Sequence, residues 1–194
     1  MSNPINDAVQ AHYRAADLGD AILAALEKAG KDRDRLKPED LAPVDAFHIR
    51  GRAATLELAR AAGLHAGQQV LDVGSGIGGT ARCLANEFGC RVIGVDLTEE
   101  YCRAATLLSA TVGLGDLVQF RQGDATALPF EDATFDVVWS EHVAMNIADK
   151  PRLYREMHRV LRPGGTLAIY DILAGTGGPV LFPVPWARTP ATSF

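Results

Sequence analysis

The sequence predicts an α/β protein in which a doubly wound, Rossmann-like parallel sheet follows a helical N-terminal segment. Three observations support this fold class. Short apolar runs typical of buried strands alternate with helical segments, glycines close several of the helices, and a glycine-rich turn follows the first apolar run. Alternating strands and helices form βαβ units, which place the strands parallel and a ligand at their carboxyl ends.

Two helices are expected before the sheet, over residues 17–30 and 52–62. In the first, the apolar side chains of Leu18, Ile22 and Leu26 recur every four positions. Five strands are expected at 70–73, 91–95, 118–121, 135–139 and 166–172, with helices between them at 79–88, 98–112 and 151–162. The chain thus divides into a helical preface or lid (1–63), a sheet-bearing core (64–173) and a tail rich in proline and glycine (174–194).

Composition and charge exclude several classes of protein. The 194 residues are 47% hydrophobic and 22% charged, which is typical of a globular domain and not of a disordered chain. A net charge of −5 argues against a nucleic-acid partner, and no apolar run is long enough to predict a membrane span. The chain starts without a secretory signal, and three cysteines without a C-x-x-C pair favour reduced thiols in the cytoplasm over disulfides or a metal site.

The glycine-rich turn after the first expected strand is the strongest candidate for a binding site. Glycines there let the backbone approach a ligand, and the following helix offers unpaired N–H groups at its start. Two spacings overlap in the turn: Gly74, Gly76 and Gly79 fit the G-x-G-x-x-G of dinucleotide folds, whereas Gly74, Gly76 and Gly78 fit the G-x-G-x-G of S-adenosylmethionine enzymes. Packing alone is a third explanation of such a turn.

Three aspartates at successive strand ends favour the second spacing. Asp72 lies inside the first strand. A binding site for a pyrophosphate has no need of an additional negative charge there, whereas a cationic ligand such as a sulfonium is attracted to one. Asp96 ends the second strand and is placed to accept hydrogen bonds from two ribose hydroxyls, a role that serves either cofactor. Asp124 follows the third strand, at the height of an adenine amine. Each aspartate has a plainer interpretation as a helix cap or turn residue.

These motifs resemble the class I S-adenosylmethionine-dependent methyltransferases over about residues 65–172. The resemblance rests on Asp72 to Gly78, Val95 to Leu97, Gly123 to Ala125 with Leu128 to Phe130, Phe135 to Val138, and Leu161 to Gly165. It implies S-adenosylmethionine as the cofactor. The cofactor-binding residues that it implies are Asp72, Gly74, Ser75, Gly76, Gly78, Asp96, Leu97, Gly123, Asp124 and Ala125.

The segment from His142 to Ile147, with residues 43–52, is similar to the branch that includes sarcosine/dimethylglycine, tocopherol and quinone-pathway methyltransferases. This similarity implies a small-molecule acceptor and leaves open whether nitrogen, oxygen or carbon is methylated. Relatives of this kind continue with two further strands, which the proline-rich tail cannot form. We therefore expect either a shortened form of a longer enzyme or a partner, such as a second copy, that covers the edge of the fifth strand.

Candidate catalytic residues follow the fourth strand. Methyl transfer is a direct in-line displacement, so the protein mainly positions and desolvates the reactants. His142 is expected beside the methyl group as a base or an acceptor-orienting residue, and the adjacent Glu141 beside the methionine portion or a cationic acceptor. The alternative for His142 is a hydrogen-bonded histidine in the pocket wall.

Two residues of the helical preface are further candidates for cofactor binding. The Arg50 guanidinium is suited to the cofactor's carboxylate, and the Tyr13 ring to covering the sulfonium, although a surface arginine and a packed tyrosine are equally good interpretations. Two other functions stay open. One is a catalytically silent cofactor-binding or scaffold protein, and the other is an NAD-dependent oxidoreductase, against which Asp72 and Asp124 argue.

Overall fold

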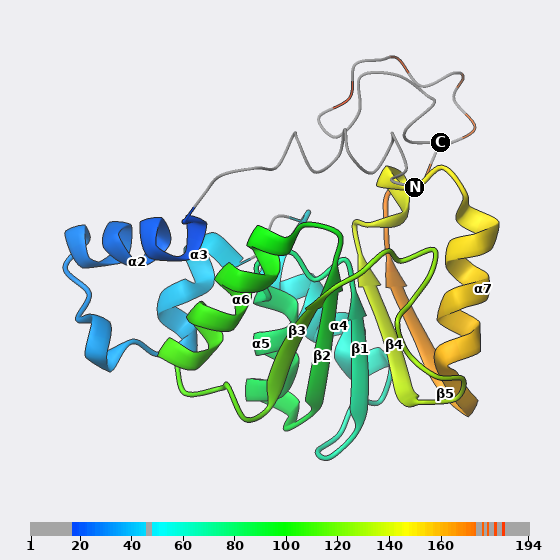
Figure 1. Ribbon diagram of the computed structural model, residues 1–194, viewed down its shortest axis with the longest axis horizontal. Coiled ribbons are helices and arrows are strands. Elements are labelled where there is room, and N and C mark those ends of the chain that lie inside the picture. Colours follow the sequence, from blue (N-terminus) through cyan, green and yellow to red (C-terminus); the bar gives the residue numbers. More distant parts are fainter. Residues whose placement is uncertain are drawn as a thin grey trace.

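A parallel five-stranded sheet forms the centre of the computed structural model, which describes residues 17–45 and 48–173 together with residues 176, 178, 181 and 184. Its strands are β1 (Gln69–Val73), β2 (Arg91–Asp96), β3 (Val118–Gln122), β4 (Phe135–Glu141) and β5 (Leu161–Tyr170), in the order β3-β2-β1-β4-β5 (Figure 1). All four pairings are parallel. The order reverses between β1 and β4, which is where a sheet of this kind opens a crevice for a ligand.

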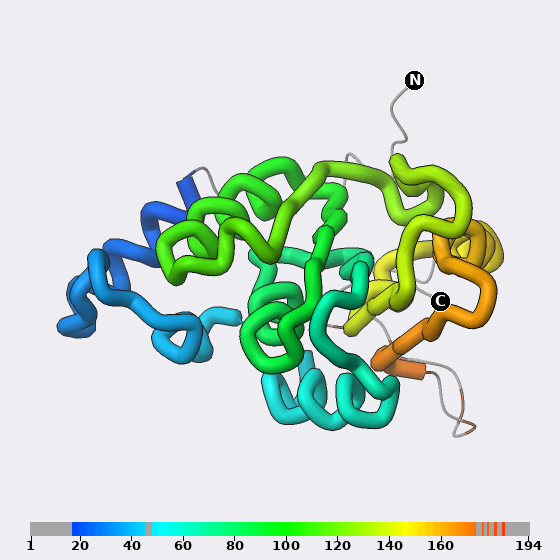
Figure 2. Tube along the Cα trace, turned by 90° about the horizontal axis from the view of Figure 1, so that it is seen from below, coloured from blue at the N-terminus to red at the C-terminus, as the bar shows by residue number. Residues whose placement is uncertain are grey.

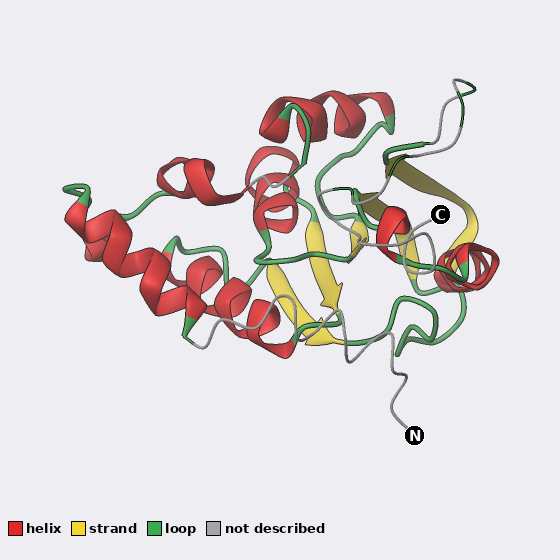
Figure 3. Cartoon of the chain, turned by 90° about the horizontal axis from the view of Figure 1, so that it is seen from above, coloured by secondary structure: helices red, strands yellow, loops and turns green. Residues whose placement is uncertain are grey.

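Helices cover both faces of the sheet. Those of the described residues are α2 (Leu18–Lys28), α3 (Ala42–Asp45), α4 (Gly51–Ala61), α5 (Gly79–Phe88), α6 (Glu99–Thr111) and α7 (Lys150–Val160), with short 3-10 turns at 33–35, 38–41 and 144–146. Seen from above, the helices up to α6 gather to one side of the strands and α7 lies on the other (Figure 3). The predicted α/β class with a doubly wound parallel sheet is confirmed.

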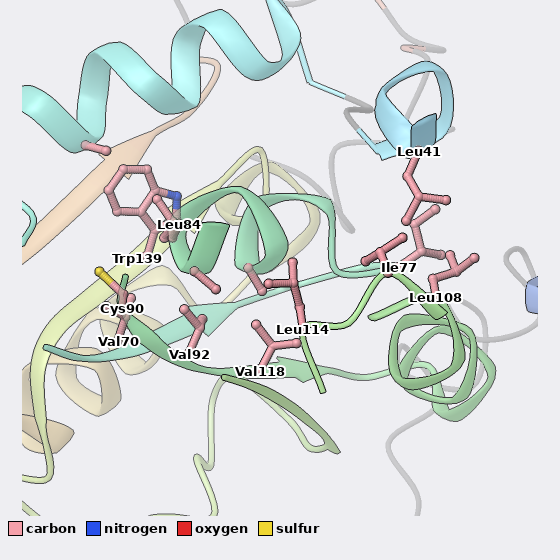
Figure 4. Packing of buried hydrophobic residues seen from close by; sticks show 14 of the residues in the cluster. Leu41, Val70, Ile77, Leu84, Cys90, Val92, Leu108, Leu114, Val118 and Trp139 are labelled. Atoms are coloured by element: carbon pink, nitrogen blue, oxygen red, sulfur yellow. The ribbon is translucent and has the colours of Figure 1, made fainter. Parts of the chain in front are cut away.

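Two apolar clusters fill the space between these layers. The larger one joins Val70, Val92 and Trp139 of the sheet to α5, α6 and the N-terminal helices, as Figure 4 shows around Leu84 and Leu108. The smaller one packs the buried face of α7 against the opposite face of the sheet. Both clusters lie below the carboxyl ends of the strands, so they hold the strand ends rigidly in place.

The N-terminal helices pack into the same core. Leu23 and Leu41 are fully buried in the larger cluster, and the backbone N–H of Leu18 donates to Glu100 Oε1 of α6 at 3.0 Å. α2 and α7 therefore occupy opposite ends of the molecule (Figure 2). The predicted bounds of these first helices agree with the structure to within two residues.

The fifth strand departs from its predicted bounds of 166–172. It begins at Leu161, directly after α7, and ends at Tyr170. Leu161 already pairs with Phe135, and the register then shifts before Thr166 pairs with Val137. Proline and glycine between these pairs indicate a turn locally, but pairing with β4 keeps them in an irregular strand.

Among the described residues, β5 is the last strand on its side of the sheet. Most of the tail (174–194), which we expected to form no further strand, lies outside those residues. Leu167 and Ile169 of this strand are 39% and 36% exposed, which is high for side chains of a parallel sheet. None of the described helices is long and apolar enough to span a membrane.

Candidate active site

A cavity of about 830 Å³ opens at the carboxyl ends of the strands, within the size range of ligand pockets. Its wall brings together most of the residues that the sequence singles out. They lie at or just after the carboxyl ends of β1, β2, β3 and β4. Those that line it are Gly74, Ser75, Gly76, Asp96, Leu97, Gly123, Asp124, Ala125, Glu141 and His142. Residues 48–49 and Met145 to Ile147, which belong to the segments that resemble the small-molecule branch, also line it. Thr80, Asp149 and Arg152 are among the wall residues that the sequence did not indicate.

The glycine turn after β1 forms the floor of one end of the cavity. The N–H groups of Gly74 and Ser75 both donate to the Val95 carbonyl, at 2.7 and 3.0 Å, and the N–H of Gly76 donates to Asp96 Oδ2 at 2.9 Å. Gly76 has a φ of 53°, and a Cβ there would meet no atom within 4 Å. The turn is thus fixed to β2, while its glycine faces open space that a ligand can enter.

The carboxylate of Asp96 is held in the cavity wall by backbone donors. Its Oδ1 accepts from the N–H of Thr98, the residue before α6, at 2.9 Å. Burial raises the pKa of Asp96 above its usual value, although these backbone hydrogen bonds act in the opposite direction. Each carboxylate oxygen can accept a second hydrogen bond, so ribose hydroxyls still find acceptors here.

Asp72 lies behind the glycine turn and does not reach the cavity wall. It is only 2% exposed, and its Oδ2 has no hydrogen-bond partner among the described residues. Burial raises the pKa of Asp72 well above its usual value, and the nearby carboxylates of Glu141 and Asp96 raise it further. A positive charge beside Asp72 would favour the ionised form of this carboxyl group.

Asp124 has two roles in the structure. Its Oδ1 accepts hydrogen bonds from the N–H and the hydroxyl of Thr126, at 2.8 and 2.7 Å, which closes a turn after β3. The plainer interpretation as a turn residue is therefore correct. The same residue also lines the cavity next to Gly123 and Ala125, where the predicted adenine site lies.

Glu141 organises the other end of the cavity. Its carboxylate accepts hydrogen bonds from the hydroxyls of Thr55, at 3.0 Å, and Thr80, at 2.7 Å, and lies 3.5 Å from His48 Nε2. These three partners come from α4, α5 and the segment before α4. The sequence does not predict these contacts, because no local spacing links Thr55, Thr80 and His48 to β4.

His142 has a backbone conformation that is rare for a residue with a side chain. Its φ is 55°, and its N–H donates to the Tyr170 carbonyl at 2.8 Å. Burial and the nearby His48 lower the pKa of His142, while Asp171 and Glu141 act to raise it. The net lowering favours a neutral imidazole, which can accept a proton. Strained backbone of this kind often marks functional positions.

Besides Asp72, two predicted cofactor-binding residues among the described ones do not line the cavity, Arg50 and Gly78. Arg50 is exposed and its guanidinium pairs with Glu57 at 2.6 Å, outside the cavity wall. Gly78 is the N-cap of α5 with a φ of 83°, and a Cβ there would overlap the Phe120 ring. Tyr13 lies outside the described residues. Within the described part of the chain, no group of side chains is arranged to hold a metal ion.

A Rossmann-like sheet with a glycine turn and acidic residues at the strand ends defines a protein that binds a nucleoside-containing ligand. The match to known families narrows this class. Residues 71–169, about half of the chain, match the family described as "Methyltransferase domain". The chain belongs to this methyltransferase family.

Curated relatives cover different chemistry. The chain is similar to a sterol 24-C-methyltransferase of Eremothecium gossypii (40% identity over 59% of this chain and 31% of that protein) and to methyltransferase GfsG of Streptomyces halstedii (37% over 69% and 48%). A tocopherol O-methyltransferase of Arabidopsis thaliana is 40% identical over 53% of this chain and 29% of that protein. The chain thus spans between about a third and a half of the length of these relatives.

Solved structures show the same fold. A phosphoethanolamine N-methyltransferase 2 of Haemonchus contortus, in complex with phosphomonomethylethanolamine and S-adenosylhomocysteine, matches with a TM-score of 0.60 and 34% identity, over 64% of this chain and 29% of that one. The [4+2]-cyclase SpnF matches with a TM-score of 0.62 and 30% identity, over 66% and 47%. Because a cyclase shares the fold, the reaction has to be argued from the site.

Proposed function

We propose that this protein is an S-adenosylmethionine-dependent methyltransferase that transfers the methyl group directly to a small-molecule acceptor. The observation that carries the proposal is the buried carboxyl group of Asp72, with one oxygen unpartnered, next to Asp96 and Glu141 and directly behind a glycine turn. The negative charge of a dinucleotide pyrophosphate would raise the pKa of Asp72 further, whereas a ligand that carries a sulfonium and an ammonium group would favour the ionised carboxylate.

The residues present fit this cofactor along the length of the cavity. Asp96 is placed to accept hydrogen bonds from the ribose, and Asp124, with Gly123 and Ala125, to contact the adenine. The glycine turn allows the backbone to approach the ligand closely, and its free volume at Gly76 lies on the cavity side. When bound, S-adenosylmethionine would supply an activated methyl group and would retain on its sulfur the electron pair of the broken carbon–sulfur bond.

The acceptor end is formed by Glu141 and His142. His142 takes the proton of an O–H or N–H acceptor, and the electron pair of that bond stays on the acceptor atom for bond formation with the methyl carbon. Glu141, fixed by two threonine hydroxyls, holds negative charge near the transferring centre. Apolar side chains, including Ile49, Met145 and Ile147, line the same cavity and exclude water from it.

Calorimetric titration of the purified chain tests the cofactor. We expect S-adenosylhomocysteine to bind and NAD to produce no heat, and binding of NAD alone would contradict the proposal. Incubation with methyl-labelled S-adenosylmethionine and a cell extract then tests the reaction, with His142→Gln as the inactive control. Label in a small molecule supports the proposal, whereas bound cofactor without any labelled product supports a silent binding protein.

We further propose that a second copy of the chain covers the exposed face of β5, because Leu167 and Ile169 are apolar and exposed at the last described strand. Light scattering that shows a monomer at all concentrations would contradict this pairing. A cytoplasmic location is supported by Cys83, Cys90 and Cys102, which are all free and buried.

A further inference from the structure

Three rings from distant segments meet at the acceptor end of the cavity. His48 precedes α4, His142 follows β4, and Tyr170 ends β5. The ring centroids of His142 lie 5.8 Å from those of His48 and 5.4 Å from those of Tyr170, and the third pair is 6.2 Å apart. The His142 imidazole is therefore in contact with a ring on two sides.

Polar contacts of both ring nitrogens fix the His48 imidazole. Its Nε2 lies 3.5 Å from Glu141 Oε2 and 3.3 Å from Thr55 Oγ1, and its Nδ1 lies 3.4 Å from the Ile49 carbonyl. The side chain of His48 is only 8% exposed. Because Glu141 is itself fixed by Thr55 and Thr80, the His48 ring has a rigid support at its Nε2.

We propose that His48 is a positioning residue for His142: supported by Glu141 and packed against the His142 ring, it holds that imidazole in place and unprotonated at the acceptor end. The inference rests on the proposed function for what His142 does with its free nitrogen. It assigns to the segment before α4 a part in the chemistry, which neither the family match nor the relatives' names describe.

The charges around His142 agree with this role. Glu141 faces it from β4, Tyr170 and Asp171 from the end of β5, and His48 from the segment before α4. The Asp171 carboxylate is held by the N–H groups of Ala144, at 2.7 Å, and Ile172, at 2.8 Å. Both carboxylates favour protonated His142, and His48 is the group in this set that opposes them.

Titration of the imidazole signals by nuclear magnetic resonance, on the chain without cofactor, tests the proposal directly. His48→Phe keeps a ring and removes both nitrogens, whereas His48→Gln keeps a donor toward Glu141 without an imidazole. The His142 signal is identified by its loss in His142→Gln. His158→Gln, which changes an exposed histidine of α7, is the matched control.

In both His48 variants we expect the midpoint of the His142 titration to rise by about half a pH unit or more, while His158→Gln leaves it unchanged. An unchanged or lower midpoint in a folded variant overturns the proposal, and so does loss of folding in both variants, which would show a structural role. Calorimetry with S-adenosylhomocysteine on the same samples separates this result from the cofactor proposal. If the wild type binds none, the proposed function fails whatever the titration shows.

Discussion

The two ends of the cavity are built in different ways. At the cofactor end, backbone groups of neighbouring loops bind one another: the glycine turn donates to Val95 and Asp96, and Gly123 donates to the Asp96 carbonyl. At the acceptor end, side chains from segments far apart in the sequence converge on Glu141 and His142.

The two ends of the cavity are therefore sensitive to substitutions in different parts of the chain. The cofactor end depends on a few glycines and aspartates that follow strands directly, so its geometry is set by the sheet. The acceptor end depends on the placement of the segment before α4, which the sheet does not determine. Substitutions that separate these two dependences test the comparison.

The largest effect is expected at Arg82, which joins the two ends. It is 1% exposed, pairs with Asp45 and donates to the Ile77 carbonyl at 2.8 Å. Arg82→Met leaves Asp45 without its partner, so the free energy of unfolding should fall by about 3–5 kcal/mol. Urea denaturation measures this loss, with Arg103→Met as the control because that arginine pairs with Glu100 at the surface. Equal losses in both variants would contradict a linking role for Arg82.

Asp96→Ala tests the cofactor end. Removal of the carboxylate that we propose to bind both ribose hydroxyls should weaken S-adenosylhomocysteine binding about a hundredfold or more. Calorimetry measures the affinity, and Asp116→Ala, at an exposed position before β3, is the matched control. A loss of less than about fivefold would remove Asp96 from the ribose site.

Asp72→Asn tests the charge behind the glycine turn through the pH dependence of stability. The pKa of Asp72 is raised in the folded state, so this carboxyl contributes stability at low pH that is lost as the pH rises above about 4. Asparagine does not titrate. The variant should therefore gain stability relative to the wild type as the pH is raised from 4 to 8, while it binds S-adenosylmethionine more weakly. A stability difference that is constant over this range, measured by urea denaturation, would contradict the raised pKa.

Thr55→Val tests the acceptor end alone. The valine keeps the shape of the buried side chain but removes its hydrogen bond to Glu141, so we expect a loss of about 1–2 kcal/mol in the free energy of unfolding. Affinity for S-adenosylhomocysteine should change less than about twofold. Thr106→Val is the control, since that hydroxyl only donates to a carbonyl of its own helix. A large loss of cofactor affinity would show that the two ends are not independent.

The smallest effect is expected from Arg50→Ala. The exposed pair with Glu57 contributes little, so both stability and cofactor affinity should stay nearly unchanged. A several-fold loss of affinity in calorimetry would instead restore the cofactor-carboxylate role that the sequence suggested.

The cofactor end could be predicted from the sequence because its parts are local. A glycine turn directly after a strand, and an aspartate at the end of the next strand, are read from contiguous residues once the sheet is assumed.

Glu141 and His142 were predicted as candidates at the acceptor end, but their side-chain contacts and backbone conformation could not be predicted in this way. Thr55 and Glu141 are 86 positions apart, and no periodicity relates them. The left-handed backbone of His142 was also invisible, because a positive φ is expected of glycine and not of histidine. The early start of β5 was missed because local proline and glycine suggest a turn, whereas the partner strand decides the pairing.

Gly79, the first residue of α5, influences the shape of the acceptor end because it has no side chain. A Cβ at Gly79 would overlap the backbone of Asp45, so α3 can rest on the start of α5 only because this residue has no side chain. Any other amino acid here would displace the chain that leads to His48. The shape of the proposed acceptor end therefore depends partly on the absence of a side chain at Gly79, which does not itself line the cavity.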